Sequence, residues 1–159
     1  MEPAPNVQPV GIVGIGYEGR TAYDLVADLV ALGVSKLVDV RLNPISRKPG
    51  LSKTALGRAL TEAGIVYEHR RELGNPKVNR PGFGGPPQEL AAAKFAYKSL
   101  LTAPAADEAL NEIADAGESE LVAILCFEAD QHRCHRDVVL QEARKRSTKS
   151  SAANTRRGR

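Results

Sequence analysis

Short apolar runs alternate along this chain with longer segments whose apolar residues recur at helical spacing. Four runs have the length and apolar character of buried strands: 10–15, 36–42, 65–69 and 121–126. Five segments have the periodicity or the flanking residues of helices: 21–33, 53–63, 89–101, 105–116 and one that begins near residue 134. This alternation predicts an α/β fold in which a mostly parallel sheet is flanked by helices on both faces.

Turn residues between these elements divide the chain into one domain and two terminal segments. Thr21 can cap the first helix, and Gly33 can end it. The segment 71–88 is rich in proline and glycine, which is typical of a functional lid or a flexible loop. We expect three regions: a flexible N-terminus at 1–9, a single domain at 10–145 and a basic, disordered tail at 146–159.

The chain has 159 residues, which is enough for one domain with a substantial core. No apolar run approaches the roughly 20 residues that cross a bilayer. Residues 1–9 lack the basic region and apolar stretch of a secretory signal. We therefore expect a cytoplasmic protein without membrane contact, whose two cysteines stay reduced rather than forming a disulfide framework.

Positive charge is concentrated at the C-terminus. Seven basic and no acidic residues lie between Arg144 and Arg159, so removing them from the net charge of +3 leaves about −4 on residues 1–143. Such a segment cannot bury an apolar face, and we expect it to be disordered. It is either a solubilising extension or a weak, salt-sensitive contact with nucleic acid.

Glycine and charged residues follow the first two predicted strands. Gly16 lies in a glycine-rich turn, which is either a plain tight turn or a place where the backbone approaches a phosphate. Asp39 and Arg41 share one face of the second strand, because side chains alternate along a strand. They form either a buried ion pair or, together with Ser46 and Arg47, an anion site. In a parallel sheet these groups come to the carboxyl edge, where ligands bind.

The densest group of reactive side chains follows the last predicted strand. Cys126 ends that strand, Glu128 comes two residues later, and Cys134, His135 and Arg136 follow at the predicted start of a helix. A cysteine at a helix N-terminus beside an arginine would have a stabilised thiolate. A histidine there could act as an acid or a base near neutral pH.

Other interpretations of this group stay open. The two cysteines with His135 or His132 could bind zinc, although their spacing lacks the C-x2-C pair of common structural sites, and adjacent helical residues point apart. Arg136 follows Cys134 by only two residues, whereas the arginine of a phosphatase-type loop follows its thiol by several. This spacing argues against a phosphatase-type or rhodanese-like loop. Both cysteines could also pack as small apolar residues while Glu128 pairs with a neighbouring cation. We expect no metal and no cofactor.

Three motifs carry a resemblance to a known family. They are D-V-R at 39–41 with Pro44 and S-R at 46–47, G-I-V-Y at 64–67 with L-G at 73–74, and L-C-F-E at 125–128 followed by C-H-R at 134–136. Together they resemble domain-of-unknown-function family 488 over about residues 12–143. The chain differs from the usual family pattern in strand one, where Tyr17-Glu18 replaces a His-Ser pair.

The resemblance implies an α/β fold with these motifs at one end of the sheet, and it implies no reaction. From the residues, we expect a phosphate-bearing ligand, a nucleotide or a nucleic-acid end, held by Arg41, Arg47 and Arg136. One cysteine would be the nucleophile or redox-sensitive group, while Glu128 or His135 transfers protons. The alternative is a non-catalytic anion sensor or interaction module with structural cysteines, in which the loop 71–88 reports occupancy.

Overall fold

Four parallel strands form one sheet in the order β1-β4-β2-β3. They are β1 (Gly11–Gly16), β2 (Lys36–Asp39), β3 (Val66–His69) and β4 (Leu121–Cys126). The computed structural model describes residues 7–157, with side chains described up to residue 147. All six residues of β4 are buried, because this strand lies between β1 and β2 and is covered on both faces. A strand buried on both sides reads as one continuous apolar run, which is the pattern of the sequence here.

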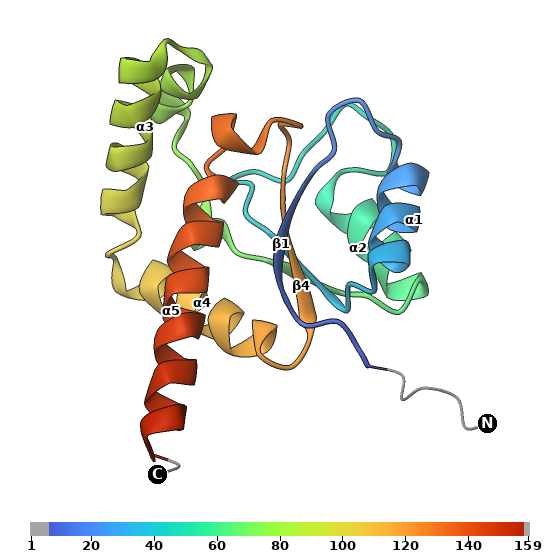
Figure 1. The fold of residues 1–159 in the computed structure, drawn as a ribbon. Coiled ribbons are helices and arrows are strands. Elements are labelled where there is room, and N and C mark those ends of the chain that lie inside the picture. The colour runs from blue at the N-terminus through green and yellow to red at the C-terminus, as the bar shows by residue number, and fades with distance from the viewer. Residues whose placement is uncertain (1–6, 158–159) are drawn as a thin grey trace, which may run out of the picture.

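Helices cover both faces of the sheet (Figure 1). One face carries α1 (Ala22–Leu32) and α2 (Lys53–Glu62), and the other carries α3 (Pro87–Leu100), α4 (Pro104–Gly117) and α5 (Arg136–Arg157). Alternate residues of β4 serve the two layers. Leu121, Ala123 and Leu125 pack with α1 and α2, whereas Val122, Ile124 and Cys126 pack with the other three helices. The predicted α/β fold with a parallel sheet is therefore confirmed.

Local signals set several of the element ends as expected. The Thr21 hydroxyl accepts a hydrogen bond from the Asp24 backbone N–H at 3.0 Å and caps α1, and Gly33 ends that helix with φ of 80°. The end of β2 differs from the expectation, since the strand stops at Asp39 rather than at residue 42. The Asp39 carboxylate accepts the Arg41 backbone N–H at 3.1 Å and turns the chain out of the sheet.

The segment 71–88 is more regular than a loop. It contains three short 3₁₀ helices, at Arg71–Leu73, Lys77–Asn79 and Pro81–Gly84, and α3 already begins at Pro87. Proline suits the first position of a helical turn because its missing N–H would lack a partner there anyway. Side chains hold the segment against α3: the Tyr97 hydroxyl donates to the Leu73 carbonyl at 2.6 Å, and Phe83 is buried.

The two ends of the chain fall partly outside the described residues. Residues 1–6 of the expected flexible N-terminus lie outside them. The backbone of α5 continues to Arg157, and Arg144 and Arg146 contact the domain through the Ile12 carbonyl and the Asp107 carboxylate. Side chains beyond residue 147 are not described, so the disorder of the tail stays a prediction. Within residues 7–157, none of the helices combines the length and the apolarity that crossing a bilayer requires.

The end of β1 packs directly against the loop that follows β4. The Glu18 backbone N–H donates to the Phe127 carbonyl at 2.8 Å. A Cβ atom added at Gly16 would lie 2.0 Å from the Glu128 carbonyl oxygen, which belongs to the backbone and cannot rotate away. Gly16 is therefore required for this close approach.

We expect Gly16→Ala to destabilise the domain by about 1–3 kcal/mol, because the added methyl group overpacks the contact with the Glu128 carbonyl. The matched control is Gly84→Ala, since a Cβ atom at Gly84 meets nothing within 4 Å. Urea unfolding of both variants measures the difference. An unchanged midpoint for Gly16→Ala would contradict the packing described above.

Candidate functional site

The carboxyl ends of the four strands meet at one edge of the sheet. Asp39 pairs in register with Leu125 on β4 and with His69 on β3, and Gly16 pairs with Cys126. The predicted gathering of Asp39, Arg41, Cys126 and Glu128 at a single edge is thereby confirmed, because Arg41 and Glu128 each follow their strand by two residues.

A buried ion pair stands at the end of β2. The Arg41 guanidinium donates to both carboxylate oxygens of Asp39, at 2.9 and 2.7 Å, and Asp39 has no exposed surface. The Tyr67 hydroxyl donates to the same carboxylate at 2.6 Å. Burial and this hydrogen bond raise the pKa of Tyr67 above its usual value. Burial alone would lower the pKa of Arg41, but its hydrogen bonds with Asp39 outweigh burial and raise it.

The remaining donors of Arg41 also point inward. One terminal nitrogen donates to the Leu51 carbonyl at 2.7 Å and to the Tyr17 hydroxyl at 3.3 Å. Four of the five guanidinium N–H groups are thus used inside the protein. Of the two interpretations given to Asp39 and Arg41, the buried ion pair is the one that this geometry supports, and one N–H remains for a ligand.

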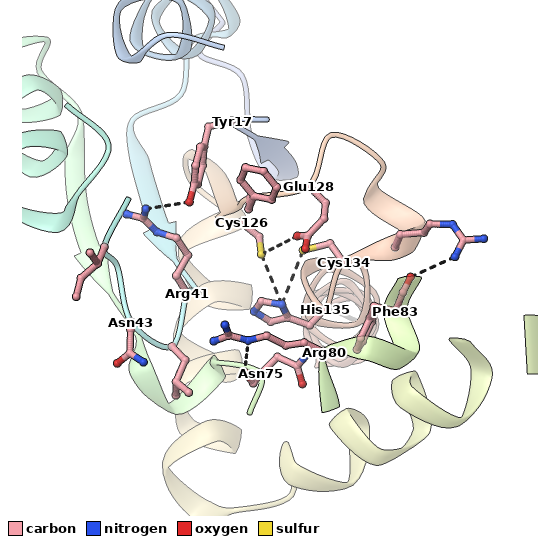
Figure 2. Close-up of a pocket in the computed structure, with 14 residues that line it drawn as sticks. Tyr17, Arg41, Asn43, Asn75, Arg80, Phe83, Cys126, Glu128, Cys134 and His135 are labelled. Carbon is pink, nitrogen blue, oxygen red and sulfur yellow. Dashed lines mark hydrogen bonds between the residues drawn. The ribbon is translucent and has the colours of Figure 1, made fainter. Parts of the chain in front are cut away.

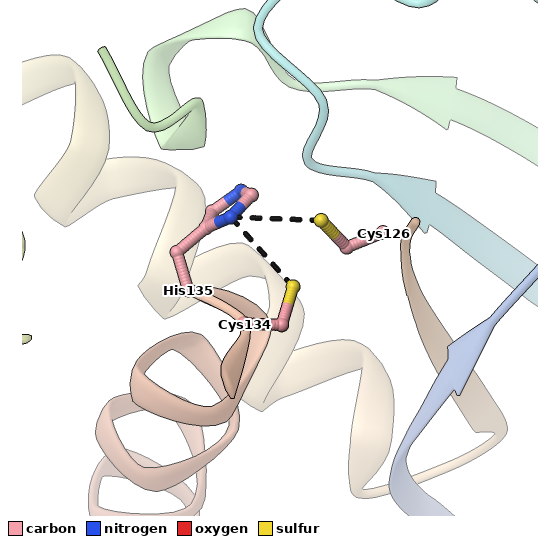
Figure 3. Close-up of side chains that lie close together, drawn as sticks. All are labelled: Cys126, Cys134 and His135. Carbon is pink, nitrogen blue, oxygen red and sulfur yellow. Dashed lines mark hydrogen bonds between the residues drawn. The ribbon is translucent and has the colours of Figure 1, made fainter. Parts of the chain in front are cut away.

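Two thiols and one imidazole form a compact cluster (Figure 3). The Nδ1 atom of His135 lies 3.6 Å from the sulfur of Cys126 and 3.8 Å from the sulfur of Cys134. The other ring nitrogen, Nε2, donates to the Val40 carbonyl at 2.8 Å, since a carbonyl can only accept. We call Cys126, Cys134 and His135 the cysteine–histidine cluster.

The expectation that Cys134 and His135 point apart is wrong. It assumed a helical backbone, but α5 begins only at Arg136, and Cys134 is extended with φ of −135° and ψ of 145°. The sulfur and the imidazole of these neighbours therefore converge. The potential ligand atoms of the cysteine–histidine cluster all lie within 4.8 Å of one another, which is close enough for one metal ion to contact all three.

The pKa values of the two thiols shift in opposite directions. Burial alone would raise the pKa of Cys134, but hydrogen bonds with Cys126 and His135 outweigh burial and lower it to about 6. The hydrogen bond to Cys134, together with burial, raises the pKa of Cys126 well above its usual value. The geometry therefore favours the thiolate form at Cys134 over the thiolate form at Cys126. The Glu128 carboxylate lies 3.4 Å from the sulfur of Cys126.

A cavity of about 260 Å³ opens next to the cysteine–histidine cluster at the carboxyl edge (Figure 2). Its lining residues come from five segments of the chain: Tyr17; Arg41, Leu42, Asn43 and Ile45; Asn75, Arg80 and Phe83; Cys126–Glu128; and Arg133–His135. We call this cavity the strand-end pocket. Figure 2 shows Arg41 and Asn43 across the cavity from Glu128 and Cys134.

Two of the arginines expected at this site do not line the strand-end pocket. Arg47 is exposed and outside the lining. Arg136 is buried and donates to the backbone carbonyls of Glu128 and Ala129, at 2.6 and 3.4 Å. It pins the loop after β4 through these carbonyls rather than through the Glu128 carboxylate. The expected trio of Arg41, Arg47 and Arg136 around one anion is therefore wrong as a geometric arrangement.

The other expected ligand-binding residues also have local partners. Gly16 lines a second hollow of about 420 Å³ together with Gly14, Arg20 and Arg136. The Ser46 hydroxyl accepts a hydrogen bond from the Lys48 backbone N–H at 3.1 Å. The backbone N–H of Ser46 donates to the Ser52 hydroxyl at 3.0 Å. Ser46 thus shapes the turn before α2 and is not part of the strand-end pocket.

Sequence reasoning missed two arginines of the strand-end pocket. Arg80 follows the second 3₁₀ helix, and its Nε donates to the Asn75 carbonyl at 3.3 Å. Arg133 directly precedes Cys134, and one of its terminal nitrogens donates to the carbonyls of Phe83 and Gly85. The unusual composition of 71–88 was the available signal for Arg80, and proximity to Cys134 was the signal for Arg133.

The Asp39–Arg41 pair yields a stability prediction. Arg41→Ala and Asp39→Ala should each cost about 3–5 kcal/mol, because each leaves one buried charge without its partner. The double variant should cost clearly less than the sum of the two. The matched control is Lys36→Ala, which breaks the partly exposed pair with Glu68 and should cost less than about 1 kcal/mol. Additive costs in urea unfolding would show that the two side chains are not coupled.

One of the comparisons with known proteins identifies a family. No curated protein matches the chain, and no solved structure matches it either. One family model, described as "Domain of unknown function DUF488", matches residues 22–143. This span contains β2, β3, β4 and every lining residue of the strand-end pocket except Tyr17. The chain therefore belongs to the DUF488 family.

Proposed function

We propose that this protein is an enzyme that binds a phosphate-bearing ligand in the strand-end pocket and acts on it with the thiol, imidazole and carboxylate groups of the same lining. The ligand is a nucleotide or the end of a nucleic acid. The observation that carries this proposal is the composition of one cavity, which places thiol, imidazole and carboxylate groups beside Arg80 and Arg133. Reactive groups and anion-binding groups in one concave site are the expected arrangement of an active site.

The charges around the pocket favour an anion. Glu128 is the one carboxylate in the lining, which also contains three arginines. Arg41 is neutralised by Asp39, but within the described part of the chain neither Arg80 nor Arg133 has a carboxylate partner. Guanidinium groups bind phosphate oxygens in a planar, bidentate geometry. Arg80 and Arg133 thus replace Arg47 and Arg136 as the anion-binding residues of the proposal.

The apolar part of the lining favours a nucleotide over a bare phosphate. Tyr17 and Phe127 pack edge to face with their ring centres 5.3 Å apart, and Phe127 is 41% exposed at the rim. Exposed aromatic rings provide stacking surfaces for bases. A cavity of about 260 Å³ is at the small end of ligand sites. It fits one nucleotide or a terminal residue better than a duplex.

The lining of the strand-end pocket also contains groups that can transfer protons or act as nucleophiles. Glu128 contacts Cys126, and the cysteine–histidine cluster lines the same cavity. Both cysteines are free, which suits a location in the cytoplasm where thiols stay reduced. The basic residues after Arg146 would add a weak, salt-sensitive contact if the ligand is a nucleic acid.

Melting experiments test the binding part of the proposal. Inorganic phosphate, a nucleoside 5′-monophosphate and a 5′-phosphorylated oligonucleotide should each raise the melting temperature of the wild type, since a ligand at 100 times its Kd adds about 2.7 kcal/mol. The shift should disappear in Arg80→Ala and Arg133→Ala, each compared with its own ligand-free melt. Arg58→Ala on α2, outside the pocket lining, should keep the full shift. Equal shifts in all three variants would place the anion elsewhere and overturn the proposal.

Turnover distinguishes an enzyme from a non-catalytic sensor. The sensor reading is favoured by the burial of both thiols, since Cys126 is 6% and Cys134 is 2% exposed. Incubation with the same nucleotide and oligonucleotide, followed by mass spectrometry, should reveal a product with the wild type. Glu128→Gln should keep the melting shift but form no product. Binding without any product from the wild type would support the sensor.

A further inference from the structure

The cysteine–histidine cluster has the dimensions of a zinc site. Zinc–sulfur bonds of about 2.3 Å and zinc–nitrogen bonds of about 2.0–2.1 Å place tetrahedral sulfur and nitrogen ligands roughly 3.6 Å apart. In this protein the Nδ1 atom of His135 lies 3.6 and 3.8 Å from the two sulfurs. All three ligand atoms lie within 4.8 Å of one another. A single ion can therefore contact the three without a rearrangement of the backbone.

The surroundings of His135 are those of a metal ligand. A histidine that binds a metal through one ring nitrogen usually donates the other N–H to a carbonyl or carboxylate, which fixes the tautomer and the ring orientation. Here Nε2 donates to the Val40 carbonyl at 2.8 Å. In its neutral form the ring would present the lone pair of Nδ1 to a metal ion that lies between the two sulfurs. The Tyr97 ring packs edge-on against the imidazole, with ring centres 5.1 Å apart, and further holds its orientation.

The three residues sit at the boundary between core and cavity. Cys126, Cys134 and His135 are each less than 8% exposed, yet all three line the strand-end pocket. An ion among them would be shielded from bulk water on the protein side and reachable from the pocket. In catalytic zinc sites three protein ligands leave a fourth position open for water or substrate, whereas structural sites are closed by four.

We propose that Cys126, Cys134 and His135 bind one zinc ion, with the fourth coordination position open to the strand-end pocket. The proposed metal site does not depend on the phosphate-bearing ligand of the proposed function. Its role in the reaction rests on the proposed function: zinc would make a water bound at the open position more acidic, and the Glu128 carboxylate, which lies 3.4 Å from the sulfur of Cys126, could accept its proton. The cysteines would then be ligands rather than nucleophiles.

Cobalt(II) is the probe for this site, because tetrahedral thiolate coordination gives visible d–d bands and a near-ultraviolet thiolate-to-cobalt band. Full-length protein, reduced and stripped with a chelator, should bind one equivalent of cobalt with these bands, and zinc should displace it. Cys126→Ser, Cys134→Ser and His135→Gln should each weaken binding by at least 100-fold. The matched control is His132→Gln, since His132 is 82% exposed and outside the cluster.

Folding and ligand binding are checked separately. Far-ultraviolet circular dichroism shows whether a variant is folded, and X-ray absorption of the zinc-loaded wild type should give two sulfur and one nitrogen ligand even if a variant fails to fold. The inference is overturned if the reduced wild type binds no cobalt, or if its spectrum lacks the thiolate band. In either case the phosphate-dependent melts of the proposed function can still succeed. If cobalt binds, added phosphate should change the d–d bands of the wild type, and unchanged bands would show that the fourth position does not face the pocket.

Discussion

The carboxylate of Asp39 has no exposed surface and accepts hydrogen bonds from the Arg41 side chain, the Arg41 backbone and the Tyr67 hydroxyl. These bonds end β2 and turn the chain out of the sheet after Val40, whose backbone N–H still donates to the Leu125 carbonyl of β4. The two carbonyls that follow are then in place for the imidazoles: Val40 accepts from His135 at 2.8 Å, and Arg41 accepts from His69 at 2.8 Å. Residues 39–41 thus position both imidazoles at the carboxyl edge, and the local geometry depends on the buried Asp39–Arg41 pair.

This dependence explains why charged residues stand inside an apolar core. A buried ion pair adds little net stability, because desolvation offsets most of the attraction. The pair instead orients neighbouring groups. Arg41 also donates to the Tyr17 hydroxyl, just after β1, and to the Leu51 carbonyl, in the segment before α2. The pair therefore joins the ends of β1 and β2 and the segment before α2 around the cavity. An apolar replacement would fill the space without orienting these groups.

The sequence predicts the layers of the fold well and the site only in part. Continuous apolar runs identify β4, and Thr21 and Gly33 mark α1, because these signals act within a few residues. The direction of Arg136 could not be predicted, since it depends on whether residues 134 and 135 are helical or extended. The extended backbone of Cys134, followed by a turn at His135, brings the sulfur and the imidazole together at the pocket.

The position of Arg80 in the pocket could not be predicted from the periodicity of the sequence either. Its position depends on how 71–88 folds against α3, through contacts such as that of the Tyr97 hydroxyl with the Leu73 carbonyl. Motif and family similarity located the edge of the sheet correctly because parallel strands bring their ends together regardless of loop detail. Which arginines line the strand-end pocket depends on side-chain packing, which local sequence does not encode.

In our proposals, the zinc ion and the phosphate share the strand-end pocket. A crystal structure of the zinc-loaded protein soaked with a nucleoside 5′-monophosphate, with anomalous scattering measured at the zinc edge, would show both positions at once. We expect a zinc peak among Cys126, Cys134 and His135 and the phosphate beside Arg80 and Arg133. A phosphate bound instead in the second hollow, beside Gly16, or sulfurs without an anomalous peak between them, would contradict these proposals.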